Sequence, residues 1–367
     1  MRRLVIGVLA LVTVLGVCGA QDKEAVKIGG IFSISGDCSV SGDQFCDGAL
    51  LRLKEQNSRQ SLFDYKMIVE DDAGTQMRSV LAYHKLVSVD KCDVIFDIWA
   101  GPGAAIAPLA AKDRRLVINS SWFAKIADDP LAFIHCTQPV SQAELMARTL
   151  NGLGVKRVAV MYFYQQGAIA GAEAFANRAR RLGMETKELY FNPGEIDFRG
   201  HLLKFHDFNP DAYMLITLNP EFEILLSRIK QSGFKGIVTS IEGFTYLDKL
   251  DKYSGYFFVE GNQPTDEFKK RYLAEAGKAT AGYVGNGYDM MDLVIYAYET
   301  AGAKLHRKPT TAEAAEVLRH LKDYPGAIGP LTMGSNRVIQ SQAVLKYIEN
   351  GKAVPVTIEE LKKKLQK

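Results

Sequence analysis

Apolar runs alternate with segments of helical periodicity from Val26 onward. The run Val26–Phe32 is typical of a short buried strand, and apolar side chains recur at helical spacing from Asp43 to Asn57. Further strand patterns occur at residues 65–69, 93–98, 116–118 and 133–134, with helical segments at 75–89 and from 102 onward between them. This βαβ alternation predicts a parallel sheet with helices on its faces.

The same alternation is repeated from Gln142 to Val259. Helical patterns at 142–153, 168–182, 198–208 and from 221 onward separate strand patterns at 157–162, 185–190, 212–216, 236–239 and 255–259. The chain then carries helical segments at 283–302 and 311–321, an extended stretch at 338–347 and a lysine-rich end. Two consecutive rounds of one pattern predict two similar α/β lobes.

Two of the helical segments carry apolar side chains on one face, which is typical of helices that cover a sheet. In segment 75–89 these side chains are Met77, Val80 and Leu81, with His84 beside them. In the helix from Glu221 they are Phe222, Leu225, Leu226 and Ile229.

Composition places the chain among ordinary folded proteins. It has 367 residues, of which 47% are hydrophobic and 24% charged, so disorder and a disulfide-held miniature fold are excluded. A length of this size favours two domains. The net charge is only +3, without long blocks of one sign, so a nucleic-acid partner is not expected.

The first twenty residues have the order of a secretory signal. Arg2 and Arg3 precede an apolar run from Leu4 to Val17, and Cys18-Gly19-Ala20 follows before a polar segment. We expect residues 1–20 to be removed after Ala20, and the mature protein to be exported to the periplasm. A lipid anchor on Cys18 is the alternative, but the bulky Val17 fits that processing poorly.

Four cysteines remain in the mature chain, at 38, 46, 92 and 136, and three pairings are possible. Export favours disulfides. We favour a bond between Cys38 and Cys46, which are only eight residues apart, and expect Cys92 and Cys136 to be buried thiols.

In this order the chain resembles the leucine/isoleucine/valine-binding proteins, the branched-chain amino-acid class of type I solute-binding proteins of ABC importers. The segments that carry the resemblance are Val26–Gly36, Glu70-Asp-Asp-Ala-Gly74, Gly101–Leu109, Gly233-Phe-Lys-Gly236, Gly287-Tyr-Asp289 and Gly329-Pro-Leu-Thr332. The resemblance implies two lobes joined by three crossover strands, near residues 135–139 and 260–264 and between 336 and 347. It assigns residues 24–137 and 263–338 to the first lobe, and 138–262 and 339–367 to the second. It further implies a monomer with an ABC permease as its partner.

A binding protein of this kind holds its solute in a cleft beyond the carboxyl ends of the strands. In the first lobe, Trp99, Ala100 and Gly101 follow a strand and begin a helix, whose free amide groups suit a carboxylate. Asn119, Ser120 and Ser121 follow the next strand, and Ser121 matches a hydroxyl position of the family. Ala100 stands where relatives have a serine that binds the ligand carboxylate, so a plain α-amino acid is less strongly indicated.

The second lobe contributes three further loops to the expected site. Tyr164 and Gln165 neighbour a position where relatives have a tyrosine, and Asn219 replaces an aromatic residue of the family. Glu242 matches an acid that pairs with the ligand ammonium, which a closing cleft strengthens. Trp122 and Phe244 add aromatic side chains near these loops.

Enzymatic alternatives find no support in the motifs. The sequence has no Gly-x-Ser-x-Gly elbow, no phosphate loop and no His-Glu-x-x-His, and its six histidines lack ligand spacing. Gly101-Pro-Gly103 resembles a dinucleotide loop, but Ile106 replaces its third glycine. We therefore expect no catalytic activity, no metal and no cofactor.

Two functions remain. The first is import: the protein binds an amino acid or a small carboxylate by hinge closure and delivers it to the permease. An aromatic carboxylate is an alternative to a branched amino acid, because the three family positions noted above differ. The second function keeps the same fold but signals the bound ligand to a receptor instead of a permease.

Overall fold

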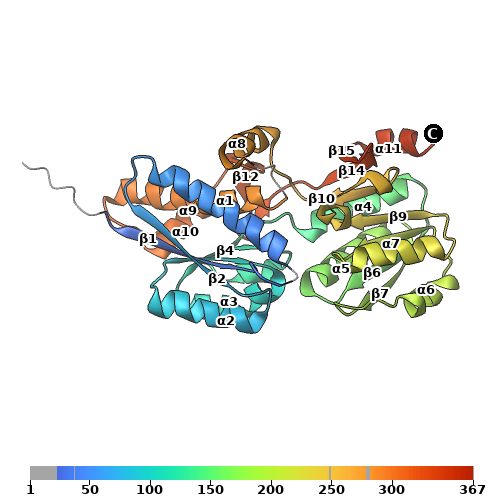
Figure 1. Ribbon diagram of the computed structural model, residues 1–367, viewed down its shortest axis with the longest axis horizontal. Coiled ribbons are helices and arrows are strands. Elements are labelled where there is room, and N and C mark those ends of the chain that lie inside the picture. The colour runs from blue at the N-terminus through green and yellow to red at the C-terminus, as the bar shows by residue number, and fades with distance from the viewer. Residues whose placement is uncertain (1–22, 37, 248, 278–281, 367) are drawn as a thin grey trace, which may run out of the picture.

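The computed structural model describes residues 23–36, 38–247, 249–277 and 282–366, and shows two α/β lobes side by side (Figure 1). The expected leader, including Cys18, lies outside these residues. Each lobe contains one main sheet. The expected α/β class, with two parallel sheets flanked by helices, is confirmed.

The first sheet has five strands, all parallel. In spatial order they are β2 (Asp64–Asp71), β1 (Ala25–Phe32), β3 (Val94–Ile98), β4 (Leu116–Ser120) and β5 (Ala132–Ile134). Three of these strands, β3, β4 and β5, are buried along their whole length. Burial on both faces explains why they read as continuous apolar runs rather than as alternating patterns.

The second sheet has a parallel part and an antiparallel edge. The parallel strands are β7 (Glu185–Phe191), β6 (Arg157–Phe163), β8 (Ala212–Ile216), β9 (Ile237–Ile241) and β10 (Phe257–Glu260). A hairpin of β14 (Val344–Glu349) and β15 (Lys352–Pro355) continues the sheet beyond β10 in antiparallel pairing. The sequence pattern indicated an extended stretch here but not this hairpin.

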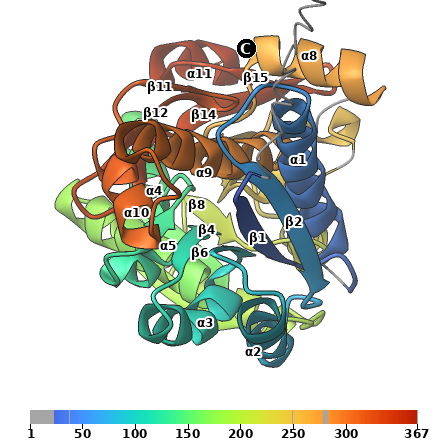
Figure 2. The same ribbon diagram turned by 90° about the vertical axis from the view of Figure 1, so that its left-hand side faces the viewer.

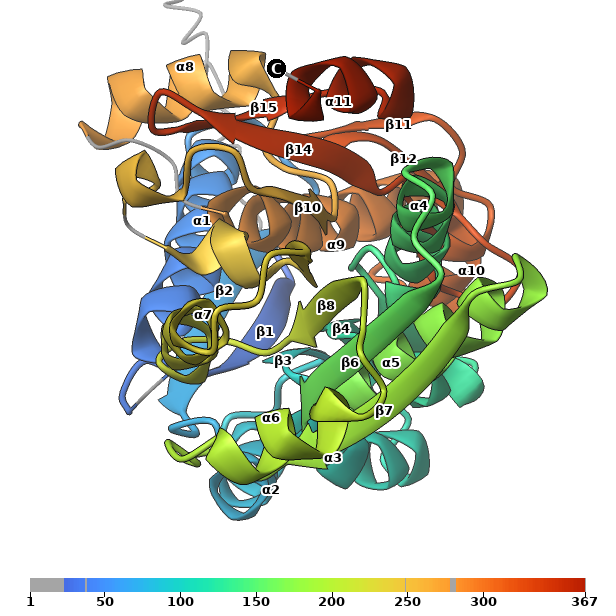
Figure 3. The same ribbon diagram turned by 90° about the vertical axis from the view of Figure 1, so that its right-hand side faces the viewer.

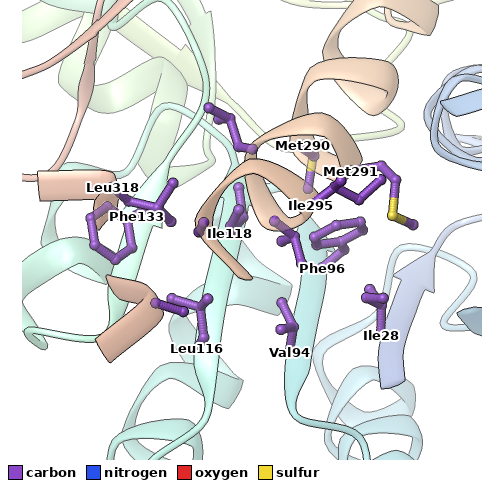
Figure 4. Packing of buried hydrophobic residues seen from close by; sticks show 14 of the residues in the cluster. Ile28, Val94, Phe96, Leu116, Ile118, Phe133, Met290, Met291, Ile295 and Leu318 are labelled. Atoms are coloured by element: carbon purple, nitrogen blue, oxygen red, sulfur yellow. The ribbon is translucent and has the colours of Figure 1, made fainter. Parts of the chain in front are cut away.

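Helices cover both faces of the first sheet (Figure 2). On one face lie α1 (Ser39–Asn57), α9 (Val284–Leu305) and α10 (Thr311–Arg319), and on the other α2 (Gln76–His84) and α3 (Ala100–Lys112). Figure 4 shows how Met290, Met291 and Ile295 of α9 pack onto side chains of the strands. Helix α9 comes from the far end of the chain, so this core closes only when the chain returns from the second lobe.

The second sheet is covered in the same way (Figure 3). One face packs against α4 (Pro139–Gly152), α5 (Gln166–Arg181) and α11 (Ile358–Leu365), and the other against α6 (Arg199–His206) and α7 (Glu221–Gln231). The apolar stripe of α7 is buried, as its spacing predicts.

The sequence pattern did not reveal helix α8 (Asp266–Ala276) or the small antiparallel sheet of β11 (Tyr324–Gly326), β12 (Gly329–Met333) and β13 (Ile339–Gln340). Only two residues of α8, Phe268 and Tyr272, are buried. Such short or weakly amphipathic elements give little periodic signal.

Three segments connect the lobes. Residues 135–138 join β5 to α4, residues 261–265 join β10 to α8, and residues 341–343 join β13 to β14. The division into 24–137 with 263–338 and 138–262 with 339–367 stays a prediction.

The prediction that the apolar face of segment 75–89 packs inward is wrong. Met77 and Leu81 are 74% and 63% exposed, whereas Ser79, Ala82 and Tyr83 are buried. The segment ends in a π-helical turn, Lys85–Val89, which buries Leu86 and Val87. The inward face is therefore set by small residues and by Tyr83, because α2 packs closely on its sheet.

The expected bond between Cys38 and Cys46 is contradicted by the course of α1. Cys38 directly precedes this helix and Cys46 lies inside it. A helix rises about 1.5 Å per residue, so eight residues separate the two by roughly 12 Å. A disulfide needs Cα atoms within about 7 Å of each other, and the structure contains none between these residues. Proximity in sequence was a poor guide because the intervening residues are helical.

Candidate functional site

The carboxyl ends of both sheets face the opposite lobe. Strand β5 ends at Ile134 and the chain passes from there into the second lobe, while β10 ends at Glu260 and the chain passes back into the first. Because parallel strands share one direction, all the loops that follow them meet between the lobes. The expected site residues belong to these loops.

Trp99 joins β3 to α3 in a strained conformation. Its φ of 75° and ψ of 152° lie in a region nearly confined to glycine. The indole Nε1 donates to Ser33 Oγ at 3.1 Å, and the Tyr283 ring meets the indole edge-on at 6.3 Å between centroids. Ala100 and Gly101 are the first two residues of α3, so their N–H groups have no partner within the helix. Pro102, the third, has no N–H.

Asn119, Ser120 and Ser121 are buried at the end of β4. Asn119 Nδ2 donates to Asp97 Oδ2 at 2.5 Å, which leaves its Oδ1 to accept the Ser121 hydroxyl at 2.5 Å. The Ser120 hydroxyl donates to the backbone oxygen of His135 at 2.9 Å. Both serine protons are thus used inside the first lobe.

Two buried carboxylates, Asp72 and Asp97, lie behind these loops, and both side chains are fully buried. Asp72 accepts the hydroxyl protons of Ser33 and Ser79, each at 2.8 Å. Asp97 Oδ1 has no hydrogen-bond partner in the described part of the chain. Burial, and after it the charge of Asp72, raise the pKa of Asp97 well above its usual range. A polar network thus runs from Trp99 through Ser33 to Asp72, and from Asp97 through Asn119 to Ser121.

Glu242 follows β9 and is also held in an unusual backbone conformation. Its φ of 60° lies in the left-handed region, and its N–H donates to the Val259 oxygen at 2.8 Å. The carboxylate accepts a hydrogen bond from Gln142 Nε2 at 2.8 Å. Glu242 therefore has a defined position at the carboxyl edge of the second sheet.

The first crossover joins the candidate residues of the two lobes. The Cys136 thiol donates to the backbone oxygen of Thr137 at 3.6 Å, and its pKa is raised by burial and then by the charge of Glu242. Gln138 Nε2 donates to the backbone oxygen of Ser121 at 3.0 Å. Gln142 Nε2 donates both to the Thr137 oxygen and to Glu242, so Ser121 of one lobe and Glu242 of the other both adjoin residues 136–138.

The other residues expected in the second lobe are not drawn into this network. Tyr164 is 57% exposed and its ring lies 5.0 Å from that of Tyr190. Gln165 precedes α5 and is exposed. Asn219, also exposed, donates to Glu223 at 3.2 Å. These three residues stay predictions.

The two further aromatic residues have different roles. Phe244 is buried in the core of the second lobe, among Phe222, Tyr253 and Phe258, so it is not at the surface between the lobes. Trp122 leaves the first lobe and packs on α5 of the second. A Cβ added at Gly167 would lie 3.0 Å from Trp122 Cβ, and one at Gly171 would lie 3.8 Å from its Cζ3. Trp122 is therefore a direct contact between the lobes.

Sequence reasoning missed Asp97, Cys136 and Gln142. Asp97 left a signal, since it is a charged residue inside the apolar strand run 93–98. Gln142 looked like any polar residue near the start of a helix. Its importance comes from strands β9 and β10, which lie more than ninety residues away in the sequence.

The surroundings of the site add three observations. Among the residues described, no group of three His, Cys, Asp or Glu side chains could hold a metal ion. No helix within the described ranges combines the length and hydropathy of a membrane span. A surface cavity of about 450 Å³ lies under α7, beside residues 236–238 and 254–257 at the amino ends of β9 and β10, away from the candidate site.

Two sequence comparisons identify the same kind of protein. The family model described as periplasmic binding protein matches residues 25–352. The Leu/Ile/Val-binding protein BraC3 of Rhizobium johnstonii is 24% identical over 348 residues, which cover 90% of this chain and 93% of the relative. The expected resemblance to the branched-chain amino-acid class is confirmed.

Solved structures show the same fold. The leucine-binding protein LivK of Thermotoga maritima superimposes with a TM-score of 0.81 at 22% identity, over 90% of this chain and 98% of that one. A solute-binding protein of an ABC transporter from R. palustris, in complex with benzoate, superimposes with a TM-score of 0.78 at 14% identity, over 90% and 95% of the two chains.

Proposed function

The chain belongs to the periplasmic binding protein family, whose members bind solutes and are not enzymes, and from this premise we propose that it binds a small carboxylate between its lobes and delivers it to an ABC permease. The observation that carries the proposal is the meeting of loops from both sheets at residues 136–138, where Gln138 contacts Ser121 and Gln142 links Thr137 to Glu242. Hinge closure of the lobes would surround a solute at this place.

The carboxylate is assigned to the start of α3. Ala100 offers no hydroxyl, and the protons of Ser120 and Ser121 are already donated within the lobe. The N–H groups of Ala100 and Gly101 remain, and the positive end of the helix dipole favours an anion there. Leucine, isoleucine, valine and benzoate, which the names of the relatives include, all carry a carboxylate.

The opposite end of the ligand distinguishes two ligand classes. An amino acid would place its ammonium group at Glu242, where exclusion of water strengthens a charged hydrogen bond. An aromatic carboxylate would instead lie against Trp99, whose indole is only partly buried. Of these two, we propose the amino acid, because the Glu242 carboxylate is held in position by Gln142.

The same premise supports export. The apolar leader of residues 1–20 precedes the described part of the chain, and a binding protein that serves a permease works outside the inner membrane. We propose the periplasm as its location.

Titration calorimetry of the mature protein tests the function. The panel contains leucine, isoleucine, valine, benzoate and 4-hydroxybenzoate, and X-ray scattering is recorded with and without each compound. We expect one-to-one binding of at least one amino acid, no chemical turnover, and a smaller radius of gyration in the complex. If no compound binds or compacts the protein, the proposed function is wrong.

A further inference from the structure

The three crossovers meet at one hydroxyl group. Thr137, in the first crossover, accepts at Oγ1 a hydrogen bond from the backbone N–H of Asn262 at 3.1 Å and another from Ser341 Oγ at 2.7 Å. Asn262 belongs to the second crossover and Ser341 to the third. Gly261 makes this approach possible, because a Cβ there would lie 2.8 Å from Thr137 Oγ1. Any rotation of the lobes about the crossovers therefore involves the hydrogen bonds of this junction.

Gln142 connects the junction to Glu242. Its side chain is fully buried in the first turn of α4. The Nε2 group donates to the backbone oxygen of Thr137 at 3.3 Å and to Glu242 Oε1 at 2.8 Å. Both partners can only accept, so the orientation of the amide is fixed by its surroundings.

That orientation leaves one acceptor unused. Gln142 Oε1 is buried and accepts no hydrogen bond from any group in the described part of the chain. Buried polar atoms in native proteins nearly always have a partner, and leaving one without is unfavourable. Since the same amide contacts Glu242, a ligand bearing N–H groups at Glu242 can supply the missing donor.

We propose that Gln142 positions Glu242 and, with it, selects a ligand that carries a protonated amine. This inference rests on the proposed function and adds the residue that links the hinge junction to the ligand. A ligand without an amine leaves the Gln142 amide oxygen without a donor and brings no positive charge to the Glu242 carboxylate, so the site discriminates against it.

The first test needs no ligand. Urea unfolding is measured for the wild type, Gln142→Met, Glu242→Gln and the double variant, with Gln231→Met, an exposed glutamine of α7, as the matched control. Because Gln142 contacts Glu242, we expect the effects of the two single substitutions on the free energy of unfolding not to add. The unfolding equilibrium constant of the double variant should differ at least fivefold from the value expected for independent effects. Strict additivity overturns the positioning role.

The second test uses leucine and 4-methylpentanoate, which is leucine without its amino group. We expect Gln142→Met to weaken leucine binding at least tenfold in calorimetry and to change 4-methylpentanoate binding less than twofold, while Gln231→Met changes neither. Equal losses for both compounds, or none, overturn the role of Gln142 and leave the proposed function standing. A wild-type protein that binds neither 4-methylpentanoate nor any compound of the panel above overturns the proposed function, and the unfolding cycle then still decides whether Gln142 positions Glu242.

Discussion

At the scale of single residues, the groups available to a ligand between the lobes depend on which acceptors the serine hydroxyls already use. Ser33, Ser120 and Ser121 all donate into the body of the first lobe. A serine at a strand end therefore does not by itself provide a donor for a ligand. We therefore assign the ligand contacts to the backbone amides of α3 and to the carboxylate of Glu242.

Replacing Glu242 by Gln tests the ligand ammonium. The change keeps the size of the side chain and removes its charge. We expect the binding free energy of an amino acid to weaken by about 1.5–3 kcal/mol, the range for a hydrogen bond to a charged group. Calorimetry against leucine measures this, and an unchanged affinity would remove Glu242 from the site.

Replacing Asp97 by Asn tests the buried carboxylate. Because its pKa is raised in the folded protein, Asp97 contributes stability that is fully present below its ordinary pKa near 3.8 and is lost as the pH rises through the folded value. Asparagine does not titrate, so the stability of the variant relative to the wild type should increase as the pH rises. We expect an advantage of about 1–3 kcal/mol in the free energy of unfolding at pH 8.

Chemical denaturation between pH 4 and pH 8 checks this sign. Asp207→Asn is the control, since the Asp207 side chain is fully exposed. A difference between Asp97→Asn and the wild type that does not change with pH would contradict the expected titration.

At the scale of elements, the segment Gly287-Tyr-Asp289 shows why its residues are needed. Gly287 of α9 faces α1 so closely that a Cβ would lie 2.0 Å from the Phe45 oxygen. Tyr288 donates to Glu55 of α1 at 2.6 Å. Asp289 accepts the backbone N–H groups of Ala327 at 2.5 Å and Ile328 at 3.2 Å. One turn of helix thus docks α9 on α1 and fixes the chain that enters β12.

Replacing Gly287 by Ala should separate α1 from α9. The added methyl group meets backbone rather than a movable side chain, so we expect a loss of about 1–3 kcal/mol in the free energy of unfolding. Gly200→Ala in α6 is the matched control, because a Cβ there has no neighbour within 4 Å. Urea denaturation compares the two, and equal stabilities would show that the helices can move apart without cost.

At the scale of the whole molecule, the lobes are connected at two places of different kinds. The crossovers meet at Thr137, which accepts hydrogen bonds from Asn262 and Ser341. Trp122 instead crosses from the first lobe to a groove of small residues, Gly167 and Gly171, on α5. This second contact joins the lobes without a covalent connection, so under the hinge closure proposed above we expect it to stabilise the closed arrangement.

Replacing Gly167 by Leu should fill the groove and hold Trp122 out. We expect ligand affinity to fall at least tenfold and the complex to keep a larger radius of gyration in X-ray scattering, because closure is impeded. Gly200→Leu is the control, as it is also the second residue of a helix in the second lobe but faces open space. Full compaction of Gly167→Leu with ligand would show that Trp122 does not limit closure.

The sequence by itself determined the class of fold and the loops that matter. Strands buried on both faces, such as β3 and β4, appear in the sequence as apolar runs. Their alternation with helices implies parallel sheets, in which the carboxyl ends of the strands lie on one side. Trp99, Ser121 and Glu242 could therefore be identified as strand-end residues without coordinates.

Only the tertiary structure decided which groups those residues contact. Distant parts of the chain decide which face of α2 packs inward, where the Ser120 hydroxyl donates and which groups Gln142 contacts. Local periodicity indicates the secondary structure of one element. Hydrogen-bond partners and close backbone contacts depend instead on which elements pack together. For this reason the loops of the candidate site followed from the pattern, and their hydrogen-bond partners followed from the packing.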